Sequence, residues 1–125
     1  MPIFESEHVQ KPWGSVATIA KNKHYSARIL RINQGHRISK HYHIVKAETI
    51  YIMRGRLMIE IVEDGNESVR ILRGGDVFRI KPKTIHRFCA HCNCDVKILE
   101  ISGAKVDDEI RLEDDYDRKV MIAKT

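Results

Sequence analysis

Apolar and polar residues alternate through most of the chain in short segments separated by turn-forming residues. Side chains of a β-strand point alternately to two faces, so this two-residue period predicts strands with one buried face. Asp64-Gly65, between two alternating segments, is a strong hairpin signal. The expected strands are 16–20, 25–33, 49–54, 56–62, 69–72, 77–80, 84–90 and 95–102, besides one that starts after Gly35.

The number and spacing of these strands favour an all-β protein, since no amphipathic helical period precedes the last segment of the chain. About ten short strands punctuated by glycine are typical of a jelly roll, whose interior holds a small ligand. We therefore expect a single domain over residues 1–125, a jelly-roll β-barrel of two antiparallel sheets with a short C-terminal extension. A chain of this length can bury a core without disulfide or metal staples.

The two ends of the chain are harder to assign. Residues 1–10 are polar and show no clear period. Lys11-Pro12-Trp13-Gly14 is typical of a turn, and we expect Trp13 to pack across a barrel end or against a partner subunit. The acidic segment 107–118 departs from strand alternation. It is either a solvated extension or short helix, or else a lid or dimer arm, and the sequence leaves these open.

Composition is that of an ordinary globular protein, with 42% hydrophobic residues. No apolar run approaches the ~20 residues that span a bilayer, and residues 1–7 lack the pattern of a secretion signal. We expect a cytoplasmic protein that does not bind membranes. The formal charge of +5 is scattered among acidic residues, which argues against nucleic-acid binding. A small anionic ligand, or solubility alone, accounts for the surplus.

Three cysteines, Cys89, Cys92 and Cys94, lie close together. A secreted disulfide scaffold would have an even number spread along the chain. The Cys92-Asn93-Cys94 pair supplies too few ligands for a structural zinc site. We expect reduced thiols on a surface turn.

Candidate metal ligands stand out in three places. His41 and His43 are two residues apart on an expected strand, so both imidazoles share one face. A returning strand brings Glu48, a hard oxygen donor, and another strand start after a turn brings His86. Three histidines and one glutamate would leave one or two coordination positions open for water or substrate.

The spacing of these ligands resembles that of the cupin family. Its first motif is matched by Gly35, His41, His43, Glu48 and Gly55. In its second motif Gly75 and His86 fit at the right separation. The departures there are Pro82, one place later than usual, Lys83 in place of a glycine, and Ala90 in place of an asparagine.

Further stretches are similar to the C-terminal domain of type II phosphomannose isomerases. These are Lys11-Pro12-Trp13-Gly14, Lys46-Ala47-Glu48 and the acidic segment that ends in Tyr116-Asp117-Arg118. The chain departs from that family at His41, Val45, Thr49 and Asp117. The resemblance implies a stand-alone, metal-dependent aldose-ketose isomerase acting on a sugar phosphate, which in the family is mannose 6-phosphate converted to fructose 6-phosphate. The divalent metal would be Zn, Mn, Fe or Ni.

Isomerisation requires a base and cations for the phosphate. Lys46, Glu100 and His36 are the candidate bases. Candidate phosphate ligands are arginines, whose paired donors match a phosphate group. Strand parity places Arg37 on the face of His41 and Arg28 on the face of Leu30 and Ile32, and Arg111 is the third; each is otherwise a solvated surface residue.

Two other functions remain open. A site of three histidines and one glutamate can hold iron with room for oxygen, as in a dioxygenase. A sugar-binding or regulatory cupin would bind its ligand without turnover. In each case we expect a small-molecule ligand and a homodimer, because the terminal strands of a jelly roll leave edges that need covering.

Overall fold

The computed structural model describes residues 3, 5–90, 93–103, 108–116 and 118. This part of the chain contains eleven strands and no helix, so it has no helix that could span a membrane. The strands are β1 (Glu7–Lys11), β2 (Gly14–Lys21), β3 (Tyr25–Ile32), β4 (Lys40–His43), β5 (Glu48–Arg54), β6 (Arg56–Glu63), β7 (Asn66–Arg73), β8 (Val77–Ile80), β9 (Ile85–Ala90), β10 (Val96–Gly103) and β11 (Glu109–Glu113).

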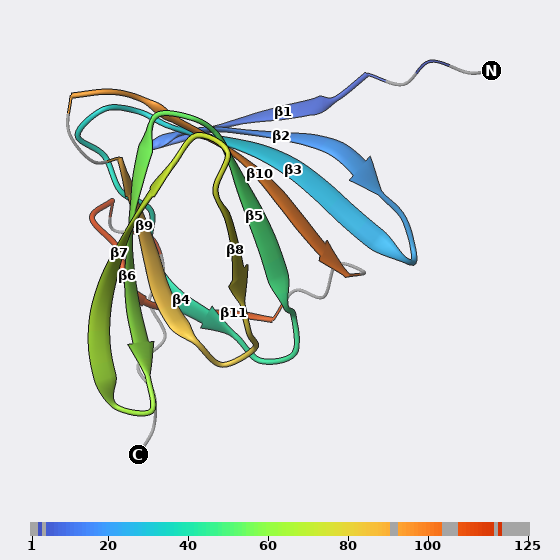
Figure 1. The fold of residues 1–125 in the computed structure, drawn as a ribbon. Coiled ribbons are helices and arrows are strands. Elements are labelled where there is room, and N and C mark those ends of the chain that lie inside the picture. Colours follow the sequence, from blue (N-terminus) through green and yellow to red (C-terminus); the bar gives the residue numbers. More distant parts are fainter. Residues whose placement is uncertain (1–2, 4, 91–92, 104–107, 117, 119–125) are drawn as a thin grey trace.

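The described strands form two antiparallel sheets (Figure 1). One has the order β1-β2-β3-β10-β5-β8 and the other the order β11-β4-β9-β6-β7. Neighbours such as β3 and β10 are far apart in sequence, as expected when successive strands cross between the sheets of a jelly roll. The predicted all-β jelly roll is confirmed.

The core lies between the sheets and follows from the alternation of the strands. Ile50 and Ile52 of β5 are fully buried, and so are Leu57 and Ile59 of β6 and Ile98 of β10. The residues between them point away from the core. Full burial of one such side chain is worth about 1.5–3 kcal/mol, so this layer is the main source of stability.

Two turns use backbone conformations that few residues adopt. The β6–β7 hairpin closes through Asp64 and Gly65, with φ of 52° and 77°. Positive φ at both central positions matches the right-handed twist of the strands and confirms the predicted hairpin. Lys83, before β9, also has a positive φ of 65°. It stands where the second cupin motif has glycine.

The structure assigns the two ends that the sequence left open. β1 is an edge strand whose five residues are all exposed. Because neither of its faces is buried, its sequence does not alternate between apolar and polar residues. The acidic segment supplies β11, which pairs with β4 inside the second sheet. Residues 109–113 are therefore neither a solvated extension nor a helix. The segment is polar because it pairs with β4, the strand that carries the polar residues of the site.

Trp13 and the cysteines complete the comparison. Trp13 is buried in the core cluster. Cys89 is buried within β9, so its placement on a surface turn was wrong, and burial raises the pKa of its thiol to about 11. Cys94 is half-buried, and Cys92 lies outside the described residues.

Candidate metal centre

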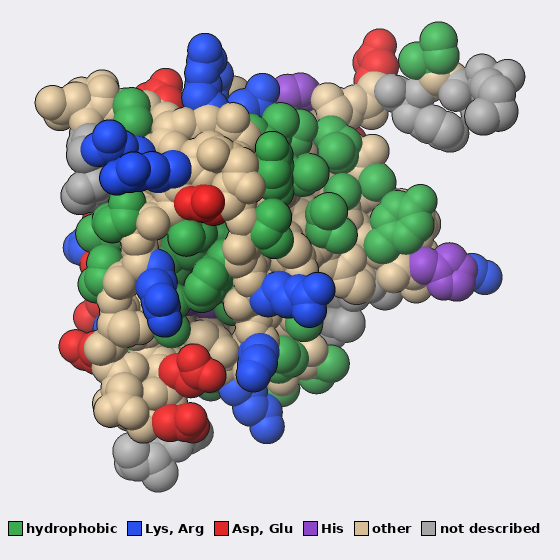
Figure 2. Space-filling model, in the orientation of Figure 1, with side chains coloured by type: hydrophobic (Ala, Val, Ile, Leu, Met, Phe, Trp, Pro, Cys, Tyr) green, Lys and Arg blue, Asp and Glu red, His purple; other side chains and the backbone are tan. Residues whose placement is uncertain are grey.

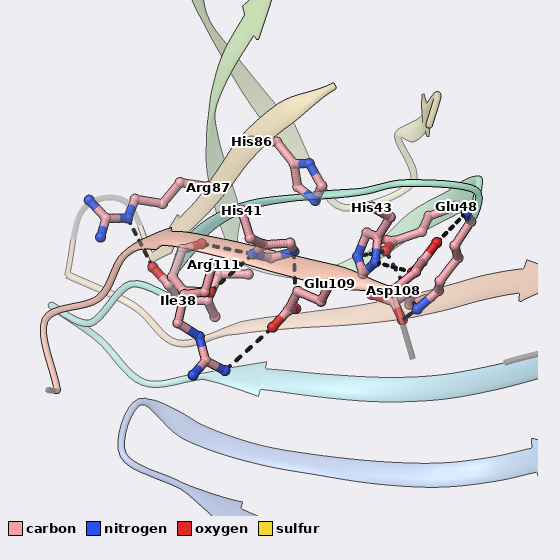
Figure 3. A network of polar contacts seen from close by, with 12 residues as sticks. Ile38, His41, His43, Glu48, His86, Arg87, Asp108, Glu109 and Arg111 are labelled. Carbon is pink, nitrogen blue, oxygen red and sulfur yellow. Dashed lines mark hydrogen bonds and ion pairs between the residues drawn. The ribbon is translucent and has the colours of Figure 1, made fainter. Parts of the chain in front are cut away.

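Three histidines converge on the inner face of the second sheet. His41 and His43 lie two residues apart on β4, and His86 on β9 is the cross-strand partner of His41. One ring nitrogen of each lies within 4.8 Å of those of the other two, so the three could hold one ion. Figure 3 shows the side chains of His41, His43 and His86 close together. All three are buried, with His86 only 1% exposed.

Each imidazole is oriented by an oxygen on its Nδ1 side. Nδ1 of His41 donates to the Ser39 carbonyl at 3.0 Å, and Nδ1 of His86 donates to the Thr84 carbonyl at 2.9 Å. Nδ1 of His43 donates to Oδ1 of Asp108 at 3.0 Å. Protonation at Nδ1 leaves the Nε2 lone pair for a metal, the arrangement that ligating histidines share.

Glu48 begins β5 and adds a carboxylate to this cluster. Its Oε1 lies 2.7 Å from Nε2 of His43, and its side chain is 2% exposed. Two buried atoms of this cluster, Oε2 of Glu48 and Nε2 of His86, have no hydrogen-bond partner among the described residues. Unpaired buried polar atoms are costly, and both are the donor atoms that a divalent ion uses. The four residues therefore fit the predicted metal.

Electrostatics hold this set ready for a cation. Burial lowers the pKa of His41 and of His86, so both are neutral at pH 7. Burial would also lower the pKa of His43, but the hydrogen bond and charge of Glu48 raise it. Burial would raise the pKa of Glu48, yet the hydrogen bond with His43 and the charges of His86 and Lys46 lower it. A metal would replace the proton between His43 and Glu48.

An ionic network extends from Glu48 to other residues of the first sheet. Nζ of Lys46 lies 3.6 Å from Oε1 of Glu48 and 3.7 Å from Oε1 of Glu100. Arg28 donates to the same Glu100 oxygen from Nε and Nη2. Burial and the charge of Glu48 raise the pKa of Glu100, while Arg28 and Lys46 oppose that shift. Two of the candidate bases and one candidate phosphate ligand therefore lie in one buried cluster.

A cavity of about 240 Å³ opens beside the histidines. Its polar lining has two parts. Carboxylates of Glu48, Glu100 and Glu109 lie toward the metal cluster, where Oε1 of Glu109 is 3.4 Å from Nε2 of His41. The cations that line it are Lys11, Arg28, Lys46, Arg111 and Arg118.

Other positively charged side chains lie near Lys11. Burial lowers the pKa of Lys11, the charges of Arg118, Arg28 and Arg111 lower it further, and the charge of Glu109 opposes them. Lys11 has no ion pair with any described residue, whereas Arg118 pairs with the buried Asp114 at 2.7 Å. The cavity therefore offers cations that suit an anion beside its carboxylates.

Two predicted site residues lie outside the cavity lining. Nδ1 of His36 is 2.8 Å from the hydroxyl of Tyr116, and Arg37 donates twice to Asp115. Strand parity failed for Arg37 because the strand that holds His41 begins only at Lys40. The structure thus brings together His41, His43, Glu48 and His86 with Lys46, Glu100, Arg28 and Arg111, and leaves His36 and Arg37 apart.

Four residues of the site had no sequence prediction of a role: Lys11, Asp108, Glu109 and Arg118. All belong to the two segments whose structure the sequence left open. Their resemblance to family stretches was the one signal that could have drawn attention to them.

A jelly roll with three histidines and a glutamate on its inner strands is the arrangement of the cupins. The chain matches the family model described as mannose-6-phosphate isomerase C-terminal over residues 4–114, and it belongs to this family. A search of curated proteins gave no match.

Solved structures support the same fold. Oxalate decarboxylase from Bacillus subtilis, a protein with Mn(II) centres, superposes with a TM-score of 0.76 at 18% identity, over 85% of this chain and 30% of that chain. The capsular polysaccharide assembling protein CapF from Staphylococcus aureus superposes with a TM-score of 0.78 at 15% identity, over 86% of this chain and 32% of that one.

KdgF from Halomonas sp. is similar in size as well as in fold. Its TM-score is 0.68 at 20% identity, over 83% of this chain and 89% of KdgF. By contrast, the chain spans about a third of the length of oxalate decarboxylase and CapF. At these identities the likeness concerns the fold.

Proposed function

We propose that the protein is a metal-dependent isomerase that interconverts the aldose and ketose forms of a small sugar phosphate. The observation that carries this proposal is one cavity whose lining combines residues of a metal-ligating cluster with several cations, among them Lys11, Arg111 and Arg118. Membership in the mannose-6-phosphate isomerase C-terminal family supports the reaction class. Mannose 6-phosphate is the first substrate to test.

His41, His43, His86 and Glu48 would hold the divalent ion, whether Zn, Mn, Fe or Ni. When bound there, it would supply Lewis-acid stabilisation of the negative charge that develops on the sugar oxygens. The burial of these residues excludes water from one side of the cavity, which strengthens electrostatic interactions within it.

Aldose-ketose isomerisation moves one proton between C2 and C1 and another between the two oxygens. Glu100 lines the cavity, and its raised pKa suits a carboxylate that accepts a carbon-bound proton and returns it to the neighbouring carbon. Lys46, held between two carboxylates, is placed to donate a hydrogen bond to a sugar oxygen. His36, bonded to Tyr116 outside the cavity lining, has no part in this scheme.

The phosphate would bind to Lys11, Arg111 and Arg118, which line the cavity. Arg28 lines the same cavity but is committed to Glu100, so we assign it to positioning that carboxylate. Arg37 points to Asp115 and is not part of the proposed phosphate site. Lys11 matters most here, because a phosphate would relieve the repulsion among the neighbouring cations.

The test is an isomerase assay with mannose 6-phosphate before and after metal removal, with the metal identified by elemental analysis. His86→Ala should abolish both metal content and turnover, and His24→Ala, at the exposed β2–β3 turn, should change neither. Turnover that persists in metal-stripped protein would contradict the proposal. Ligand-dependent stabilisation without turnover would instead indicate a sugar-binding module.

Phosphate recognition is tested separately from turnover. Mannose 6-phosphate should raise the melting temperature more than mannose does, and Lys11→Ala should remove most of that difference. Equal shifts for the two sugars would remove the case for a phosphate site.

We also propose a homodimer formed through the six-stranded sheet. Its outer face carries an apolar cross-strand row of Ala17, Ile29, Leu99, Tyr51 and Val77. Figure 2 shows hydrophobic side chains gathered over this sheet, where the side chains of Ile19, Tyr25 and Ile101 are also exposed. Light scattering should give twice the chain mass, and Tyr51→Glu should reduce it to the mass of one chain.

A further inference from the structure

Asp108 occupies the point where the C-terminal segment meets the metal cluster (Figure 3). It directly precedes β11 and is 8% exposed. Its Oδ1 accepts the Nδ1 proton of His43 at 3.0 Å, across 65 residues of sequence. A metal-ligating histidine whose far nitrogen bonds a carboxylate is fixed in orientation and is a stronger donor.

The other two histidines do not depend on a distant side chain in this way. Nδ1 of His41 donates a hydrogen bond to the carbonyl of Ser39, and Nδ1 of His86 donates one to the carbonyl of Thr84, each two residues away. These contacts form whenever the local strand forms. His43 is therefore the member of the cluster whose Nδ1 partner comes from the C-terminal segment.

The second oxygen of Asp108 holds the loop between β4 and β5. Oδ2 accepts the backbone N–H groups of Val45 at 2.7 Å and Lys46 at 2.8 Å. This loop carries Lys46 to its place between Glu48 and Glu100. One carboxylate thus positions both a metal ligand and the cavity lysine.

The rest of the segment is bound to the same sheet. Glu109 pairs with His43 and Arg111 pairs with His41 across β11 and β4, so both side chains reach the cavity. Beyond β11, Asp115 accepts two hydrogen bonds from Arg37 and lies 3.6 Å from the buried Arg87. Docking of the segment therefore completes the cavity wall.

We propose that Asp108 is a positioning residue that orients His43 toward the metal and Lys46 toward the substrate together, so that docking of β11 and assembly of the site are one event. The inference rests on the metal site of the proposed function. Loss of a group that orients a ligating histidine costs 10–100-fold in metal affinity as an order of magnitude. Bound metal should in turn hold β11 in place, because binding that requires the docked state stabilises it.

The experiment measures Zn²⁺ and Mn²⁺ affinity by competition with a chromophoric chelator. Asp108→Ala should weaken binding by about 10–100-fold. Asp108→Asn should lie between it and the wild type, because one amide oxygen cannot serve both His43 and the two backbone N–H groups. Asp115→Asn is the matched control, since it removes a contact of the residues after β11 without touching a histidine, and it should weaken metal binding far less than Asp108→Ala does.

Two readouts separate positioning from a general loss of structure. In metal-free protein, ¹⁵N NMR of the His43 ring should show the Nδ1-bound proton in the wild type and a changed tautomer population in Asp108→Ala. Hydrogen exchange of β11 should slow when Zn²⁺ is added to the wild type and should not respond in that variant. Asp108→Asn provides the same readouts should the alanine variant not fold.

The outcomes distinguish this inference from the proposed function. Unchanged Zn²⁺ and Mn²⁺ affinity in both Asp108 variants, or an equal loss in Asp115→Asn, would overturn the positioning role while leaving the metal site intact. Absence of Zn²⁺ and Mn²⁺ binding by the wild type would overturn both.

Discussion

Arg28 donates two hydrogen bonds to a single carboxylate oxygen, Oε1 of Glu100, at 2.9 Å from Nε and 2.6 Å from Nη2. The Glu100 side chain is 4% exposed and that of Arg28 is 28% exposed. Burial raises the pKa of Glu100 even with Arg28 in contact, so the ion pair only partly offsets the cost of burying this carboxylate. This pair joins the first sheet to the network around the metal cluster.

Removing one partner of this pair should lower the free energy of unfolding more than removing both. Among the described residues, Arg28→Met leaves the buried Glu100 with Lys46, at 3.7 Å, as its one ion-pair partner, and we expect a loss of about 3 kcal/mol in the free energy of unfolding. Arg28→Met/Glu100→Leu should recover at least half of that loss, because replacing a buried pair by apolar residues is often neutral. Urea titration of the three proteins measures the coupling. A double variant no more stable than Arg28→Met would contradict the account.

Lys83 offers a substitution that should stabilise the protein. Its φ of 65° lies in the left-handed region, which costs about 1–2 kcal/mol for a residue with a Cβ. Lys83→Gly should therefore raise the free energy of unfolding by about 0.5–1 kcal/mol after the entropy that glycine loses on folding. The hydrogen bond from the backbone N–H of residue 83 to the His43 carbonyl, at 2.7 Å, is retained in this variant. Lys81→Gly, two residues earlier, is the control, and a loss of stability in Lys83→Gly would show that this turn is unstrained.

The two glycines of the first cupin motif should differ in their tolerance of alanine. A Cβ on Gly55 would overlap the Asp95 carbonyl, whereas one on Gly35 has nothing within 4 Å. Both have positive φ, 84° and 77°. Gly35→Ala should cost about 1 kcal/mol from the backbone conformation alone, and Gly55→Ala should cost at least twice as much. Equal losses in thermal unfolding would mean that the approach of Gly55 to Asp95 is not required.

Acid should weaken the attachment of the C-terminal segment. Burial would raise the pKa of Asp114, but hydrogen bonds from Arg118 lower it, and the hydrogen bond from Arg37 lowers the pKa of Asp115. Both groups have folded pKa values below the unfolded value of about 3.8. Their contribution to stability is therefore complete above the unfolded pKa and is lost as pH falls through the folded pKa.

Comparison with a variant that cannot titrate isolates this effect. Between about pH 5 and pH 2, the free energy of unfolding should fall more steeply for the wild type than for Asp114→Asn/Asp115→Asn. Chemical denaturation at several pH values measures both curves. Parallel curves would contradict a role for these two carboxylates in holding the segment.

The parts of the fold and site that the sequence predicted share a local signal. Alternation located the core strands because Ile50, Ile52, Leu57 and Ile59 are buried at every second position. The four candidate metal ligands were found because His41 and His43 share a strand face, and because their spacing from Glu48 and His86 resembles the cupin motifs. The structure brings these four residues together.

The parts that were missed depend on contacts between distant segments. No pattern within residues 107–118 indicates that Asp108 meets His43, since their pairing arises only when β11 joins β4. Arg37 was misplaced because alternation was extended past the start of β4 at Lys40. β1 was missed because an exposed edge strand buries no face and so leaves no period.

The central claim, that His41, His43, His86 and Glu48 hold one divalent ion, is tested most directly by anomalous diffraction from crystals grown with Zn²⁺. The account predicts a single strong peak inside the cavity, about 2.0–2.2 Å from Nε2 of each histidine and from a carboxylate oxygen of Glu48. The same peak should be absent from crystals of His86→Ala. Wild-type crystals saturated with Zn²⁺ that show no peak at this position, or peaks only at the surface, would contradict it.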